Sequence, residues 1–126
     1  MRKILVVDDN PAFTDLVEMV FGGEYEVFKA FDGQQGIELA GRAKPDIILL
    51  DVMMPKVSGV EMLRMLQAEQ ETRAIPVIIL TASQFDATTE ALFKQEPNVS
   101  SFLQKPCGIE SLRAQIRTAL AKGVSG

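Results

Sequence analysis

Histidine and tryptophan are absent from this sequence of 126 residues, and cysteine occurs once, at Cys107. Without histidine the chain lacks the usual general base and zinc ligand, and it cannot carry a phosphohistidine of its own. A single cysteine excludes a disulfide within the chain, and we expect Cys107 to be a small packed apolar side chain. A chemical site in this protein must therefore use oxygen ligands and lysine.

Positive charge and long apolar runs are also scarce. The 13 Lys and Arg are outnumbered by 17 Asp and Glu, which gives a net charge of -4. Direct binding to nucleic acid or to anionic lipid needs clustered cations and is not expected. No apolar run approaches the ~20 residues of a membrane helix, and the run near the start stops at Asp8, too early for a signal peptide. We therefore expect a cytoplasmic protein.

Apolar residues suffice for one core, since 47% of the sequence is hydrophobic and 24% is charged. These values are typical of one globular domain. We expect residues 1–126 to form a single domain, structured over about 1–121, with 122–126 as a tail.

Short apolar runs alternate with helical patterns along the chain. The runs are too uniformly apolar for a sheet with one solvated face, and they favour a parallel sheet covered on both faces. The predicted strands are 3–7, 24–30, 46–50, 76–80 and 100–104, and the predicted helices are 11–21, 33–43, about 58–70, about 85–95 and 108–121. This βα alternation predicts an α/β doubly wound fold.

The last predicted helix has one apolar face. Ile109, Leu112, Ile116 and Leu120 repeat at helical spacing, whereas the basic residues, Arg113 among them, are predicted to point away.

Charged or hydroxyl side chains follow four of the predicted strands. Asp8 and Asp9 follow the first, Asp51 the third, Thr81 the fourth and Lys105 the fifth. In doubly wound sheets ligands bind beyond the carboxyl ends of the strands. We therefore expect three carboxylates, one hydroxyl and one ammonium to meet at one edge.

These groups suit a magnesium site that supports phosphoryl transfer. Carboxylate oxygens without His or Cys select a hard cation, and few protein ligands with room for water favour Mg²⁺ over Ca²⁺. The metal would offset the repulsion among the three carboxylates. Lys105, the Thr81 hydroxyl and the backbone N–H of Ala82 could bind phosphoryl oxygens, with an aspartate as acceptor.

Four motifs at these strand ends resemble the response regulator receiver domain, the phosphoacceptor half of two-component signalling. They are VDDN at 7–10, DVMMPKVSG at 51–59, LTAS at 80–83 and QKPC at 104–107. Each is weak alone, but the four occur in order and cover the whole chain. The resemblance implies a flavodoxin-like sheet of five parallel strands in the order 2-1-3-4-5.

The resemblance also implies a role for each site residue. Asp51 would accept a phosphoryl group from a sensor histidine kinase or a phosphotransfer protein, so the chain would be a signalling phosphoacceptor and not a conventional enzyme. Asp8 and Asp9 would hold Mg²⁺ together with Asp51 and the backbone carbonyl of Met53. Lys105 would pair with the phosphate.

The resemblance further implies a switch. Thr81 would hydrogen-bond a phosphoryl oxygen, and Phe102 stands at the position of the switch aromatic, although an aromatic in a strand is by default a core residue. The output surface for a downstream protein would be the fourth predicted helix with the fifth strand and fifth helix. The Lys105–Pro106 peptide bond would be cis.

The sequence departs from the family pattern in three places. EPNVSS at 96–101 replaces the usual Gly-Ala, and the span from Thr81 to Lys105 is about two residues longer than expected. Cys107 stands where Phe is common. The residue two after Asp51 is the apolar Met53.

Other interpretations remain. Asp8 and Asp9 could be an N-cap pair, and Asp51 a turn residue. A phosphatase of the haloacid dehalogenase type also combines Asp, Mg²⁺ and Lys. That family requires a second acidic residue two positions after the nucleophilic Asp, where this chain has Met53. A receiver-like module that binds without phosphorylation is a third possibility, disfavoured by the intact set of site residues. A flavodoxin-type cofactor carrier is excluded, because carboxylates replace the phosphate-binding loop.

Overall fold

The computed structural model describes residues 1–52, 59–81, 91, 93–105 and 108–122. The elements in chain order are β1 (Lys3–Val7), α1 (Pro11–Phe21), β2 (Glu26–Ala30), α2 (Gly33–Ala43), β3 (Ile47–Asp51), α3 (Gly59–Ala68), β4 (Val77–Thr81), β5 (Val99–Gln104) and α5 (Ile109–Lys122). The helix predicted at about 85–95 falls mostly outside the described residues, although residues 91, 93 and 94 are helical.

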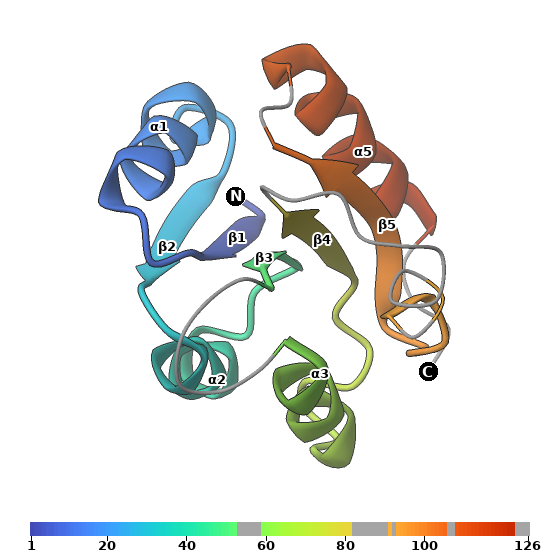
Figure 1. The fold of residues 1–126 in the computed structure, drawn as a ribbon. Helices are drawn as coiled ribbons and strands as arrows, with labels where there is room; N and C mark the ends of the chain where they lie inside the picture. Colours follow the sequence, from blue (N-terminus) through green and yellow to red (C-terminus); the bar gives the residue numbers. More distant parts are fainter. Residues whose placement is uncertain (53–58, 82–90, 92, 106–107, 123–126) are drawn as a thin grey trace.

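The strands form one parallel sheet in the order β2-β1-β3-β4-β5, which confirms the predicted topology. Figure 1 shows α1 and α5 against one face of the sheet and α2 and α3 against the other. Among the described residues, no helix combines the length and the apolar character that a membrane span requires.

Each face of the sheet carries its own apolar core. In β1, Ile4 and Val6 pack with residues of α1 and α5, whereas Leu5 and Val7 pack with residues of α2 and α3. The same alternation holds for all the apolar residues of β3, none of which is exposed. Because successive side chains of a strand point to opposite faces, burial on both faces requires the uniformly apolar runs seen in the sequence.

Close contact between α2 and β1 depends on a glycine. A Cβ at Gly36 would lie 2.9 Å from Met62 Cε and 3.0 Å from Val7 Cγ2. A side chain at this position would therefore push α2 away from the sheet.

Several boundaries differ from the prediction by one or two residues, and β3 and β4 each begin and end one residue later than predicted. β2 starts at Glu26 and not at residue 24, because the backbone N–H groups of Glu24 and Tyr25 donate to the Phe21 carbonyl at 3.0 and 2.8 Å and so extend the end of α1. β5 starts at Val99, and its pairing with β4 contains a register shift.

That shift is a one-residue bulge. Val99 pairs with Val77, but Ser101 pairs with the next residue of β4, Ile78, so Ser100 is extra. A bulge adds a residue to one strand and increases the local twist. The bulge therefore accommodates one of the about two extra residues between Thr81 and Lys105.

The predicted face of α5 is partly wrong. Leu112 and Ile116 are buried as expected, but Ile109 is 39% exposed. Residues 108–111 are all exposed, so the first turn lies beyond the core. Arg113 does not point away either, because its guanidinium lies 5.1 Å from the Phe21 ring centroid and pairs with Glu24.

Candidate functional site

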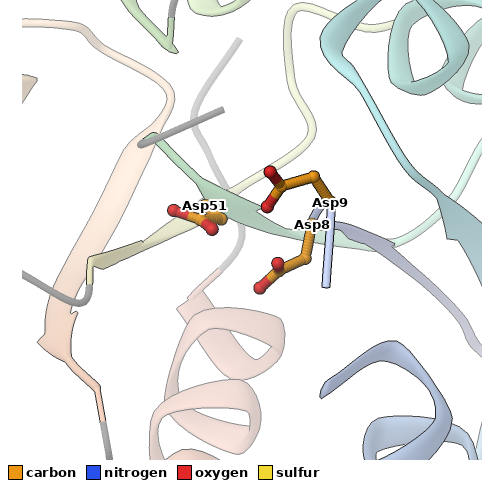
Figure 2. A group of neighbouring side chains, drawn as sticks. All are labelled: Asp8, Asp9 and Asp51. Atoms are coloured by element: carbon orange, nitrogen blue, oxygen red, sulfur yellow. The ribbon is translucent and has the colours of Figure 1, made fainter. Parts of the chain in front are cut away.

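Three carboxylates gather where β1 and β3 end. Asp8 and Asp9 follow β1, and Asp51 is the last residue of β3 (Figure 2). One oxygen from each carboxylate lies within 4.8 Å of the others. Asp8 is fully buried and Asp51 is 6% exposed, whereas Asp9 is exposed. The parallel topology thus produces the predicted acidic cluster, with one member open to solvent.

The loop between β1 and α1 fixes the position of Asp8. The Asp8 N–H donates to the Ala30 carbonyl at 3.0 Å, and the Asn10 N–H donates to Asp8 Oδ1 at 2.9 Å. Asn10 is also the N-cap of α1, because its side chain accepts from the Ala12 N–H at 3.0 Å. The N-cap interpretation of Asp8 and Asp9 is therefore wrong, and sequence reasoning missed the double role of Asn10.

The environment of Asp8 disfavours its charged form. Burial raises the pKa of the Asp8 carboxyl, and the nearby Asp51 charge acts in the same direction. Hydrogen bonds from Lys105 and from the Asn10 N–H lower the pKa, but they offset the cost of burial only in part. The acidic cluster therefore stores unfavourable electrostatic energy that a bound cation would relieve.

Lys105 supplies a positive charge at this edge. Its Nζ donates to Asp8 Oδ2 and lies 3.6 Å from Asp51 Oδ2. Its backbone N–H donates to the Thr81 carbonyl at 2.6 Å, which holds the residue at the end of β5. The Lys105 side chain is only 15% exposed, so its ion pairs are shielded from water and less weakened by salt than surface pairs.

A fourth group contacts this lysine. Phe13, in the first turn of α1, places its ring under Lys105 Nζ, with 4.2 Å between the nitrogen and the ring centroid. Sequence reasoning missed Phe13, because an aromatic residue at an apolar helix position gives no signal that separates a site residue from a core residue.

Thr81 and Phe102 lie on the two strands beside the acidic cluster. Thr81 is the last residue of β4 and is 2% exposed. Phe102 is partly buried in β5, and its ring meets that of Phe93 edge-on, with 5.9 Å between centroids. Four positions named in the sequence analysis lie outside the described residues: Met53, Ala82, Pro106 and Cys107.

The acidic cluster fits a hard divalent cation. All three side-chain ligands are carboxylates, and Mg²⁺ is characteristically bound by few carboxylates with water in the remaining positions. The exposed Asp9 provides the open side that water or a phosphoryl oxygen requires. With Lys105 beside Asp51, the arrangement can stabilise negative charge that is transferred to the Asp51 carboxylate.

The sheet order and this acidic edge together define a receiver domain. The sequence model of the response regulator receiver domain matches residues 4–117, and the chain belongs to that family of two-component signalling proteins. The family consists of signalling phosphoacceptors and not of conventional enzymes.

Similarity to individual proteins agrees with this assignment. The chain is 37% identical over 122 residues to protein PilH of Pseudomonas aeruginosa, covering 96% of this chain and 99% of PilH. It is 42% identical over 117 residues to the response regulator PleD of Caulobacter vibrioides, covering 92% of this chain but 25% of PleD. The crystal structure of the chemotaxis protein CheY4 of Vibrio cholerae superposes with a TM-score of 0.85 at 27% identity, covering 94% of this chain and 98% of that one.

Proposed function

We propose that Asp51 is the phosphoacceptor of a two-component pathway. A phosphorus–nitrogen bond of a partner's phosphohistidine breaks, a phosphorus–oxygen bond to the Asp51 carboxylate forms, and the released imidazole takes up a proton. The observation that carries the proposal is the position of Asp51, at the end of the central strand and beside two other carboxylates and Lys105.

Asp8, Asp9, Asp51 and the backbone carbonyl of Met53 are the residues that would hold Mg²⁺. When bound, the metal neutralises the carboxylates and stabilises the charge of the phosphoryl oxygens. Three oxygens within 4.8 Å of one another support this assignment for the side-chain ligands. The Met53 carbonyl rests on the family resemblance alone.

The phosphoryl oxygens would be bound by residues at the ends of β4 and β5. Lys105 would give up part of its contact with Asp8 and pair with the phosphate, and the hydroxyl of Thr81 and the N–H of Ala82 would donate to its oxygens. The 3.6 Å between Lys105 Nζ and Asp51 Oδ2 supports this role, because a group attached to Asp51 would form beside the ammonium.

Phosphorylation would then alter the output surface. We assign that surface to the fourth predicted helix, β5 and α5, with Phe102 as the aromatic that changes position when Thr81 moves toward the phosphate. The contact between Phe102 and Phe93 supports this coupling, because Phe93 belongs to the stretch predicted as the fourth helix. The device is a two-state element biased by a local charge.

The wider assignment follows the family. Residues 1–126 would form one receiver domain in the cytoplasm. Its phosphoryl donor would be a sensor histidine kinase or a phosphotransfer protein, and its downstream partner would be a protein and not a nucleic acid. The net charge of -4 supports the last point.

Mass spectrometry after incubation with acetyl phosphate and MgCl₂ tests the acceptor. We expect one added phosphoryl group in the parent and none in Asp51→Asn. Asp46→Asn is the matched control, because Asp46 is exposed and directly precedes β3 at the opposite end of that strand. The control should be labelled like the parent.

Two results would contradict the proposal. Equal labelling of Asp51→Asn and the parent would move the phosphate to another residue. Loss of labelling in Asp46→Asn would show that the assay reports strand stability and not the acceptor.

The phosphatase alternative makes a different prediction. A haloacid dehalogenase-type enzyme would release phosphate from added phosphomonoesters in many turnovers, whereas a receiver would retain one phosphoryl group per chain. Family membership over residues 4–117 favours the receiver.

A further inference from the structure

Phe13 lies where the loop that carries Asp8 enters α1. Its N–H donates to the Asn10 carbonyl at 3.1 Å, and Asn10 in turn donates to Asp8. The Phe13 side chain is partly buried against the core shared by α1 and α5. Its ring is therefore anchored on the same backbone that positions the buried carboxylate.

The ring face is occupied by the ammonium of Lys105. The distance of 4.2 Å from Nζ to the ring centroid is well inside the ~6 Å within which an aromatic face attracts a cation. Lys105 follows β5, which β4 and β3 separate from β1 in the sheet, so the contact forms only because the lysine side chain reaches across this end of the sheet to the start of α1.

The other two contacts of the Lys105 ammonium that the structure gives are charged. They are Asp8 and Asp51, both of which belong to the acidic cluster. A cation or phosphoryl group that binds to the acidic cluster changes the net charge around the Lys105 ammonium. Because a lysine side chain is long and flexible, such a change can move the ammonium. The attraction of the Phe13 ring comes from its quadrupole, which carries no net charge and does not titrate.

We infer that Phe13 is a positioning residue for Lys105, which holds the ammonium beside Asp51 through a contact that does not depend on the charge state of the acidic cluster. The inference rests on the proposed function for its effect on phosphorylation, but the contact itself can be tested without it.

The first experiment is performed on the metal-free protein. The side-chain ε-methylene protons of Lys105 should be shifted upfield by the Phe13 ring current in the NMR spectrum of the parent, and Phe13→Tyr should retain that shift. Phe13→Leu should lose it. Phe21→Leu is the matched control, because it makes the same substitution at a more deeply buried position of the same helix and core, and it should leave the Lys105 resonances in place.

The second experiment measures the rate of phosphorylation by acetyl phosphate. We expect Phe13→Leu to be about fivefold slower than the parent, equivalent to about 1 kcal/mol of barrier, and Phe13→Tyr to stay within about twofold. In a Lys105→Met background, the Phe13→Leu substitution should have no further effect, because the residue it positions is gone. Phe21→Leu should react at the parental rate.

Circular dichroism decides which Phe13 variant is used. If Phe13→Leu does not fold, Phe13→Met replaces it, since methionine keeps the apolar volume and lacks the ring.

Three outcomes would overturn the inference. They are an unshifted Lys105 methylene in the parent, an equal slowing by Phe13→Leu with and without Lys105, and a Phe13→Tyr variant as slow as Phe13→Leu. If the parent itself takes no phosphate, the proposed function fails, and the NMR comparison alone decides whether Phe13 positions Lys105.

Discussion

Strands β3 and β5 deliver opposite charges to the same edge of the sheet, but their surroundings differ. β3 is central, pairs with β1 and β4, and is buried at every residue. β5 pairs only with β4, contains a bulge, and has no fully buried residue. Asp51, the proposed acceptor, therefore ends a strand that is buried at every residue, whereas Lys105 follows a strand with no fully buried residue.

The difference indicates how a site can be rigid and responsive at once. A reacting group needs a support locked by packing, and β3 would provide that support if Asp51 is the acceptor, as proposed. Elements that change position are drawn from the less buried regions of a protein, and β5 has no fully buried residue. Lys105 joins the two, because its backbone belongs to the β5 side and its ammonium contacts the acids of β1 and β3.

The largest effect expected from this comparison concerns stability. Leu50 in β3 is fully buried and Leu103 in β5 is partly buried. We expect Leu50→Ala to lower the free energy of unfolding by about 3–4 kcal/mol and Leu103→Ala by about 1–2 kcal/mol, because the loss grows with the cavity left behind. Urea denaturation followed by circular dichroism measures both. Equal losses would remove the contrast between the strands.

The next effect separates the acids from the lysine. At a Mg²⁺ concentration ten times the dissociation constant, binding should stabilise the parent by about 1.4 kcal/mol. We expect Asp9→Asn to lose most of that gain, because few ligands remain. Lys105→Met should keep it, because the substitution removes a competing cation from Asp8. Thermal unfolding with and without MgCl₂ provides the measurement. If Lys105→Met lost the stabilisation by Mg²⁺ and Asp9→Asn kept it, Lys105 and not Asp9 would be assigned to the metal site.

The third effect is a pH dependence in the metal-free protein. The pKa of Asp8 is raised in the folded state, chiefly by burial, so the folded protein favours the protonated carboxyl. The stability linked to this group is fully present below its unfolded pKa and is lost as the pH rises through the folded pKa. As the pH rises from about 4, the parent should therefore lose stability relative to Asp8→Asn, which has no carboxyl at this position to titrate.

A matched control is Glu26→Gln, which removes an exposed carboxylate at the start of β2. Urea titrations at several pH values give the comparison. A difference between Asp8→Asn and the parent that does not change with pH would mean that Asp8 has its ordinary pKa.

The smallest effect tests the switch directly. Phosphorylation should change amide hydrogen exchange in β5 and α5 by about threefold or more and leave β1 and β2 unchanged, because Thr81 and Phe102, the residues proposed to couple to the phosphate, lie on β4 and β5. Mass spectrometry of exchanged peptides, with Asp51→Asn treated in the same way as a control, measures this. A uniform change across the sheet would contradict a localised switch.

Most of the fold could be predicted because its signals are local. Uniform apolar runs mark buried strands, and all five strands were found to within two residues. The errors arose where distant contacts decide. The bulge at Ser100 depends on pairing with β4, and the exposure of Ile109 depends on where the core ends.

The sequence alone determined which groups reach the site. Asp8, Asp51, Thr81 and Lys105 each end or follow a strand, and the strands of a parallel sheet all end at one edge, so the chemistry of that edge can be read from strand boundaries. Only the tertiary structure decided how those groups pair. Lys105 bonds to Asp8 across 97 positions of sequence and rests on the Phe13 ring, because the strand order and the packing of α1 bring these residues together. No local pattern encodes such contacts, since they depend on the placement of every intervening element.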